Sequence, residues 1–308
     1  MSSPHAAQQA KSITLIISPF HVGIANHRVG NGPNRILQRA IVSELEKLNV
    51  AVTVKKLEPV DSFEGEIGRS FALLAQTSKA VTDAVNAGSF PLILSGNCHA
   101  TIAAASGLNL THIGESSELG FVYFDAHDDL ESPSTNTNGY FDAMGMNILK
   151  GESWHALSET IPGFKPYDLK KLVYCGLRDI QDCQRQMVKD MGLDVVWGST
   201  EKHVEYEADL SAILERRRLG SVCVHLDLDV LDDTLGPVNE YPSPGGMLES
   251  DVLSCLKMVP NKCSPASLTV CSFNPDAGDG DKIADIAVKA VVGFVGSLVE
   301  TGALSRKL

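Results

Sequence analysis

The stretch FVYFDAHDDLESP, residues Phe121–Pro133, joins an apolar run to a cluster of ionisable side chains. The run 121–124 is typical of a strand that is buried on both faces of a parallel sheet. Asp125, His127 and Asp129 follow at a spacing of two residues, which places them on one side of an extended segment. Burying an unpaired charge destabilises a fold by several kcal/mol. These side chains at a strand end therefore predict a bound ligand that compensates their charge.

Strand-like runs recur along the rest of the chain, with helical patterns between them. Strands are expected at residues 13–18, 50–57, 90–96, 119–127, 171–179, 194–199, 221–230 and 266–275. Helices are expected at residues 34–48, 68–87, 180–191, 210–219, 249–258 and 281–298. This alternation predicts one doubly wound α/β domain over residues 1–308, with a parallel sheet of about eight strands. We expect residues 1–12 to form a mobile arm.

Two loops follow expected strand ends, where open α/β sheets bind their ligands. Residues 130–166 contain Pro133, Gly139, Gly145 and Gly151, and residues 232–246 read DDTLGPVNEYPSPGG. Both loops begin next to clusters of acidic residues, so we expect them to surround a functional site.

Composition and charge exclude some partners. The chain has 308 residues, is 44% hydrophobic and carries a formal net charge of −12. Nucleic acids and anionic membranes require a basic surface, so neither is an expected partner. Without a secretory h-region or a run of 18 apolar residues, we expect a cytoplasmic protein. The seven cysteines are odd in number and mostly lie in apolar segments, which favours reduced thiols over disulfides.

A second ionisable cluster, HLDLDVLDD at residues 225–233, contains Asp227 and Asp229 two positions apart. The segment LILSGNCHA at residues 92–100 adds His99 at a third strand end. Each pattern alone has a simpler explanation, since a D-x-D is often a turn and a lone histidine is often structural. Together they predict four carboxylates and two imidazoles at one edge of the sheet. Two divalent cations would balance this charge, and mixed Asp/His ligation suits Mn(II).

These segments resemble the motifs of the arginase/agmatinase ureohydrolase superfamily. DAHDD at 125–129 is similar to its D-A-H-x-D motif, HLDLDVLD at 225–232 to S-x-D-x-D-x-x-D, and SGNCH at 95–99 to G-G-x-H. VGNGPNRIL at 29–37, YCGLRD at 174–179, Gly245–Gly246 and Asn274–Pro275 also fall in family order. The resemblance spans about residues 13–300.

The resemblance implies a three-layer α/β/α fold with two Mn(2+) ions per chain. One ion would be bound by His99, Asp125, Asp129 and Asp227, and the other by Asp125, His127, Asp227 and Asp229. A hydroxide between the ions would attack an amidine-like carbon, with Asp129 orienting it or relaying its proton. Relatives in this family are homo-oligomers, so the resemblance also implies a trimer or hexamer.

The expected substrate positions depart from arginase. Ser272 stands where arginase has the glutamate that grips the guanidinium, so a charge-assisted hydrogen bond of roughly 1.5–3 kcal/mol would be missing. The positions that hold the amino-acid end of arginine correspond here to Glu131, Asn138, Tyr140 and Gln181. A glutamate there would repel a carboxylate, which argues against free arginine as the substrate.

Other departures concern proton transfer and the base of the site. Asp142 stands where arginases have a histidine thought to shuttle protons. Asp142 or Glu131 could act as a replacement acid/base or cation-binding group, and the alternative is that both cap loop turns. We interpret Cys98, which replaces an aspartate of the family, as a small residue beneath the metal rather than a nucleophile. His225 is expected to hydrogen-bond to ligands rather than to ligate.

Three functions are compatible with these residues. The preferred one is a metal-dependent hydrolase of the divergent arginase-like branch, which cleaves a C–N bond in a small-molecule or peptidyl guanidino or amidino substrate. The second is a metal-binding but catalytically silent regulatory protein. The third is a single-zinc amidohydrolase related to histone deacetylases. His21, His27 and His155 join none of these sites and are expected at the surface or in loops.

Overall fold

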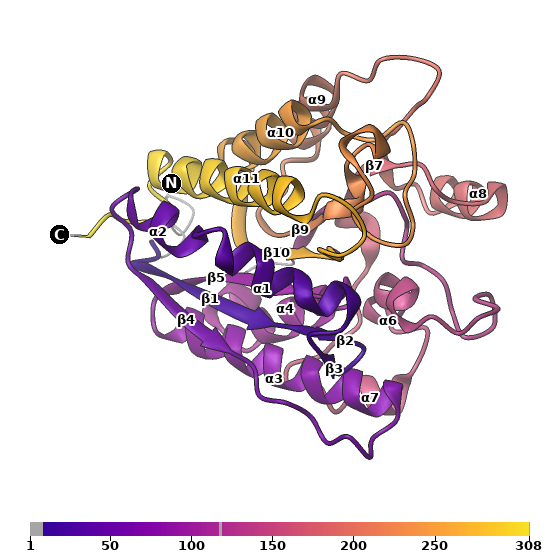
Figure 1. Cartoon of the computed structure of the whole chain (residues 1–308), viewed down its shortest axis with the longest axis horizontal. Coiled ribbons are helices and arrows are strands. Elements are labelled where there is room, and N and C mark those ends of the chain that lie inside the picture. The colour runs from indigo at the N-terminus through magenta and orange to yellow at the C-terminus, as the bar shows by residue number, and fades with distance from the viewer. Residues whose placement is uncertain (1–8, 117–118, 308) are drawn as a thin grey trace.

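An eight-stranded parallel sheet forms the centre of the computed structural model, which describes residues 9–116 and 119–307 (Figure 1). The strand order is β4-β1-β5-β10-β9-β6-β7-β8. The eight strands are β1 (Ser12–Ser18), β4 (Val52–Lys56), β5 (Ser89–Ser95), β6 (Gly120–Phe124), β7 (Leu172–Leu177), β8 (Asp194–Trp197), β9 (Ser221–Asp227) and β10 (Ser264–Cys271). Each overlaps a strand predicted from the sequence. A separate antiparallel pair joins β2 (Phe20–His21) to β3 (Ile24–Ala25).

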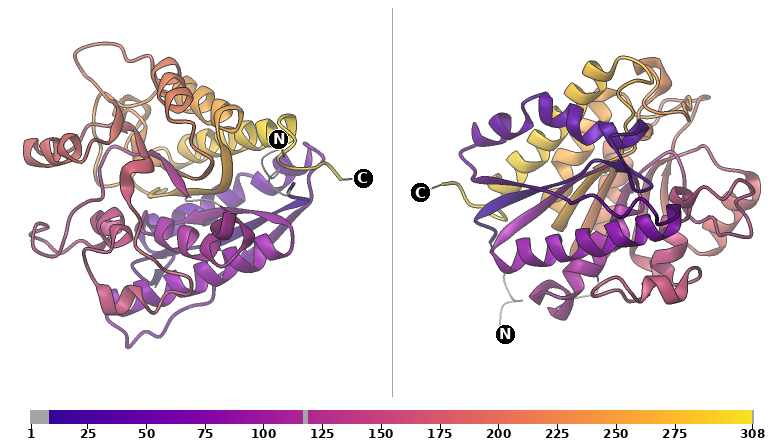
Figure 2. Two further views of the ribbon diagram at one scale, coloured as in Figure 1. Left: turned by 180° about the vertical axis from the view of Figure 1, so that it is seen from behind. Right: turned by 60° about the horizontal axis from the view of Figure 1, so that its bottom comes forward.

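Helices cover both faces of this sheet, which confirms the three-layer α/β/α architecture. One layer contains α1 (Gly32–Gln38), α2 (Ile41–Glu46), α9 (Tyr206–Arg217), α10 (Glu249–Lys262) and α11 (Gly280–Glu300). The other contains α3 (Glu66–Asn86), α4 (Ala100–Asn109), α6 (Gly145–Lys150) and α8 (Asp182–Asp190). The short helices α5 (His112–Ser116) and α7 (His155–Ser158) follow α4 and α6 in the chain. Figure 2 shows the sheet between the layers, with α3 on one side and α1 and α11 on the other.

Alternate residues of each central strand enter the two opposite cores. Val122 and Phe124 of β6 pack in the core beneath α10 and α11, whereas Phe121 and Tyr123 pack in the core beneath α3 and α4. Both faces are therefore apolar, which explains why the strands read as continuous hydrophobic runs rather than alternating ones.

Two helical segments differ from the sequence-based expectation. The helix predicted at 34–48 is divided in two, because Ala40 adopts a left-handed conformation with φ 62°. Helix α4 was not predicted, since its residues 100–108 are all buried and no amphipathic period marks the segment ATIAAASGL. The loop predicted at 130–166 also contains a 3-10 turn (Phe141–Met144), α6 and α7.

The order of the strands creates a crossover point at the centre of the sheet. β5 and β6 are consecutive in the chain, but β10 and β9 lie between them. In doubly wound sheets, ligands bind at the carboxyl edge near such a point. The strands β5, β9 and β6 end there with the segments that carry the predicted metal ligands, and β10 ends beside them with Ser272.

The chain ends and the cysteines also bear on the sequence-based expectations. Residues 1–8 of the predicted arm lie outside the described residues, whereas Ala10 pairs with Leu304 and β1 begins at Ser12. All seven cysteines are free thiols. Within residues 9–116 and 119–307, no helix combines the length and apolar character needed to cross a membrane.

Gly96, which follows β5, lies in a tightly packed part of the carboxyl edge of the sheet. A Cβ at this position would collide with the carbonyl oxygen of Phe20 and lie 2.8 Å from the Cα of Gly30. We expect Gly96→Ala to lower the free energy of unfolding by about 1–3 kcal/mol, measured by denaturant titration. Gly293→Ala in α11 is the control, because nothing lies within 4 Å of its Cβ position, and it should stabilise by about 0.5–1 kcal/mol. Equal stability of the two variants would contradict the packing.

Candidate metal centre and its cavity

A cavity of about 390 Å³ opens at the carboxyl edge of the sheet. Its wall includes all five residues predicted to contact substrate, which are Glu131, Asn138, Tyr140, Gln181 and Ser272. Seven of its lining residues are Asp or Glu, and no described Lys or Arg lines it. The cavity therefore suits a cationic ligand.

Asp125, His127 and Asp229 form the first ligand cluster, with one potential ligand atom from each within 4.8 Å of the others. The Nδ1 atom of His127 lies 3.3 Å from Asp229 Oδ2 and 3.5 Å from Asp125 Oδ1. These residues follow two adjacent strands, β6 and β9. The pairing of these strands brings the motif at residues 125–129 close to the motif at residues 227–229. The cluster brings together three of the four residues that were predicted to bind one ion, all except Asp227.

Cys98, Asp125 and Asp129 form a second cluster deeper in the site. The Cys98 thiol donates to Asp227 Oδ2 at 2.7 Å, which adds a fourth ligand-type group. Asp129 has φ 52° and accepts a hydrogen bond from the Tyr123 hydroxyl at 2.6 Å. The carboxylates of Asp125, Asp129 and Asp227 thus lie around one thiol.

Burial and mutual repulsion dominate the electrostatics of these carboxylates. Burial, followed by the charge of Asp229, raises the pKa of Asp125 to about 7. The same two causes raise the pKa of Asp227 well above its usual range. Burial also opposes ionisation of Asp229, but His127 holds the pKa of that carboxyl below its usual range. Protons and one imidazole therefore balance the charge of the cluster in the absence of cations.

The cluster fits divalent cations. The Oδ2 atom of Asp125 is buried and has no hydrogen-bond partner, which leaves a lone pair for an ion. The donor set of carboxylates and imidazole is the set that Mn(II) and similar ions prefer. The residues present are therefore suited to the metal ions that the motifs implied.

His99 is the predicted ligand that lies outside these clusters. Its Nδ1 atom lies 2.8 Å from Asp142 Oδ1, and its backbone N–H donates to the same oxygen at 3.0 Å. Asn97 donates to the other oxygen of Asp142 at 2.6 Å. Asp142 lines the cavity, but both of its oxygens are occupied by these contacts with the segment that follows β5.

Other residues of the site were not singled out from the sequence. Asp179 Oδ2 lies 3.4 Å from His127 Nε2, and Asn239 donates to Asp229 Oδ2 at 3.1 Å. Asp179 could have been found from the sequence, because it ends the GLRD motif. Asn239 lies in a loop that contains no recognisable motif. His21 was expected in a loop or at the surface, but it is buried in β2 and lies 3.4 Å from the Asn97 amide.

Two loops that face the cavity are held differently. The guanidinium of Arg178 donates to backbone carbonyl groups of the loop after β9, including those of Asp229, Leu231 and Ser243. By contrast, residues 132–140 of the loop after β6 bond mainly to one another, as in the contacts of Ser132 with Thr135. The loop that holds Asp229 is therefore fixed to β7, and the loop that carries Asn138 and Tyr140 is not.

Comparisons with known proteins agree with this fold. The model of the arginase family matches residues 11–296. Arginase from Staphylococcus aureus (strain MRSA252) is 25% identical over 308 residues, which cover 93% of this chain and 97% of that protein. The structure of Entamoeba histolytica arginase in complex with L-ornithine superimposes with a TM-score of 0.80 at 18% identity, covering 94% of this chain and 99% of that one. Formimidoylglutamase from Bacillus subtilis gives a TM-score of 0.72 at 16% identity, over 96% and 90% of the two chains.

Asp125→Asn tests whether these carboxylates are retained for metal. In metal-free protein above neutral pH, removing one buried charge should raise the free energy of unfolding by about 1 kcal/mol or more. Added Mn(II) should raise the melting temperature of the wild type but not that of Asp125→Asn. Differential scanning calorimetry with chelator or with Mn(II) measures both effects.

Asp128→Asn is the matched control. Asp128 is equally buried, but its oxygens accept hydrogen bonds from Leu130 N and Gln184 Nε2. This variant should retain the shift caused by Mn(II). If Mn(II) raised the melting temperature of Asp125→Asn as much as that of the wild type, Asp125 would not be a metal ligand.

Proposed function

The chain belongs to the arginase family, and we propose that it is a metal-dependent hydrolase of a C–N bond in a cationic guanidino or amidino compound other than free arginine. The observation that carries this proposal is the convergence of Asp125, His127 and Asp229 at a cavity lined by seven carboxylates. A metal centre supplies the reactive group, and the acidic wall selects a cationic substrate.

We assign two Mn(2+) ions per chain to this centre. Asp125, His127, Asp227 and Asp229 are the proposed ligands of one, and Asp125, Asp129 and Asp227 are those of the other. When bound, the ions would supply the Lewis acidity that activates water for attack on an amidine-type carbon. His99 is the proposed fourth ligand of the second ion, through Nε2, because its Nδ1 contact with Asp142 is the kind of partner that orients a metal-binding histidine.

Asp129 and Asp142 have different proposed roles. The Tyr123 hydroxyl fixes one oxygen of Asp129, so Asp129 is suited to orient the attacking water and to pass its proton to the departing amine. Asp142 uses both oxygens to hold Asn97 and His99, so we propose a positioning role for it rather than proton transfer.

Glu131 is the proposed cation-binding group. Its Oε2 atom is buried without a hydrogen-bond partner, while its backbone N–H donates to Ala143 and fixes the residue at the cavity. Because no described Lys or Arg lines the cavity, a substrate carboxylate would have no cationic partner there. Guanidino amines, amidines and peptidyl arginine fit these features better than a free amino acid does.

The test is a substrate panel with protein loaded with Mn(II). We expect release of urea or ammonia from at least one guanidino amine, formimino compound or arginyl peptide, with little activity on free arginine. Glu131→Gln should raise KM about tenfold or more, because a charge-assisted hydrogen bond is lost. Glu159→Gln is the control, since this exposed carboxylate is not among the cavity-lining residues.

Two results would contradict the proposal. Absence of hydrolysis across the panel, with metal shown to be bound, would favour a catalytically silent binding protein. An unchanged KM in Glu131→Gln would show that Glu131 does not bind the substrate.

A further inference from the structure

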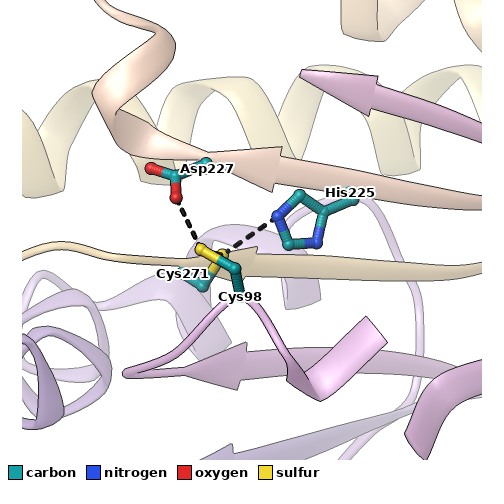
Figure 3. Close-up of side chains that lie close together, drawn as sticks. All are labelled: Cys98, His225, Asp227 and Cys271. Atoms are coloured by element: carbon teal, nitrogen blue, oxygen red, sulfur yellow. Dashed lines mark hydrogen bonds between the residues drawn. The ribbon is translucent and has the colours of Figure 1, made fainter. Parts of the chain in front are cut away.

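Two thiols, one imidazole and one carboxylate lie together at the ends of β9 and β10 (Figure 3). They belong to Cys98, His225, Asp227 and Cys271, which offer one atom each, all within 4.8 Å of one another. The two sulfur atoms are 3.7 Å apart, Cys271 Sγ is 3.3 Å from His225 Nε2, and Cys98 Sγ is 2.7 Å from Asp227 Oδ2. All four side chains are almost completely buried.

We propose that these four residues form a separate thiolate site for one divalent cation of the zinc type. Cysteine, histidine and aspartate are the residues that bind Zn(II), which takes four ligands in a tetrahedron. Two sulfur ligands at roughly 2.3 Å from a tetrahedral ion lie about 3.8 Å apart, close to the spacing already present. The contact between Cys98 and Asp227 must lengthen when an ion enters.

His225 is held in the orientation that ligation requires. Its ring is stacked on Tyr123 with 3.9 Å between the centroids, and its Nδ1 atom lies 2.5 Å from Thr101 Oγ1. A hydrogen bond from Nδ1 to Thr101 leaves the lone pair of the neutral ring on Nε2, which faces Cys271. Second partners of this kind orient metal-binding histidines in general.

Three of the ligands lie on two adjacent strands of the sheet, and the fourth lies in the turn after β5. Asp227 and Cys271 are register partners at the ends of β9 and β10, and His225 precedes Asp227 by two residues on the same face. Cys98 follows β5, the next strand in the sheet, just before α4 begins. The four groups therefore need no loop rearrangement to meet at one ion.

Binding of an ion to these four residues requires both thiols to lose their protons. Without an ion, the Cys98 thiol donates to Asp227, and Cys271 lies within hydrogen-bond reach of His225. Binding of one divalent ion replaces two thiol protons, which leave to solvent, and forms two metal–sulfur bonds. Cys98 and Asp227 line the cavity, which provides the entry path.

This site does not rest on the proposed hydrolysis. Its ligand set is complete without Asp125, His127, Asp129 or Asp229. Asp227 is also a proposed Mn(2+) ligand, and Cys98 also lies beside Asp125 and Asp129. One oxygen of Asp227 faces Cys98 and the other accepts a hydrogen bond from Asp229 N at 2.7 Å. Asp227 is thus placed to link the thiolate site to the carboxylate cluster.

The experiment uses the full chain, purified with reductant and stripped with a chelator. Elemental analysis should show one tightly held zinc ion per chain after reloading with Zn(II). Reloading with Co(II) should produce the near-ultraviolet absorption of thiolate-to-cobalt charge transfer. This absorption should fall by about half in Cys271→Ser and in Cys98→Ser, and disappear in the double variant.

Cys223→Ser is the matched control, because Cys223 is a buried thiol of β9 outside the cluster. It should keep the full absorption. His225→Gln leaves both thiols in place and should weaken zinc affinity at least tenfold, since one of four ligands is lost. Together these variants separate ligation from a general effect of altering the core.

Three results would overturn the proposal: no charge-transfer absorption in the wild type, full absorption in Cys271→Ser, or a Cys98–Cys271 disulfide in the metal-loaded protein. Hydrolysis by a protein without this absorption would refute the thiolate site and leave the proposed function intact. The absorption without hydrolysis would support the site and refute the function.

Discussion

Repulsion among buried carboxylates at one edge of the sheet is the constraint on which this structure depends. Asp125, Asp129, Asp227 and Asp229 are each almost completely buried within a single group of side chains. In the absence of an ion, protons, one imidazole and neighbouring donors offset their charge. Such an arrangement weakens a fold unless a ligand stabilises it, which is the usual compromise at functional sites.

The fold places donors where they hold the carboxylates without filling all their acceptors. His127 N donates to one oxygen of Asp125, and the other oxygen has no partner. Asp229 N donates to Asp227 in the same way, two residues along an extended segment. The backbone thus orients each carboxylate by one oxygen and leaves the second for a cation or a thiol.

The sequence predicted the parts of this arrangement that follow from local periodicity. Burial of both sheet faces made the strands recognisable, and the spacing of two predicted that Asp125 and His127 would meet Asp227 and Asp229. Helix α4 was missed because a helix buried on all sides has no amphipathic pattern. The position of Cys271 beside Asp227 was beyond prediction, because it depends on the register between β9 and β10. The contact between His99 and Asp142 depends likewise on how the loop after β6 returns to the sheet.

Arg178 has a consequence for how such a protein can diverge. Arg178 follows β7 and donates hydrogen bonds to carbonyl groups after β9, so it fixes the segment that carries Asp229 to the end of β7. Substitutions in the loop after β6 can therefore change the wall near Asn138 and Tyr140 without displacing Asp229. Divergence of this part of the cavity wall is thus separable from the position of Asp229, although Asp125, His127 and Asp129 also follow β6 and constrain where that loop begins.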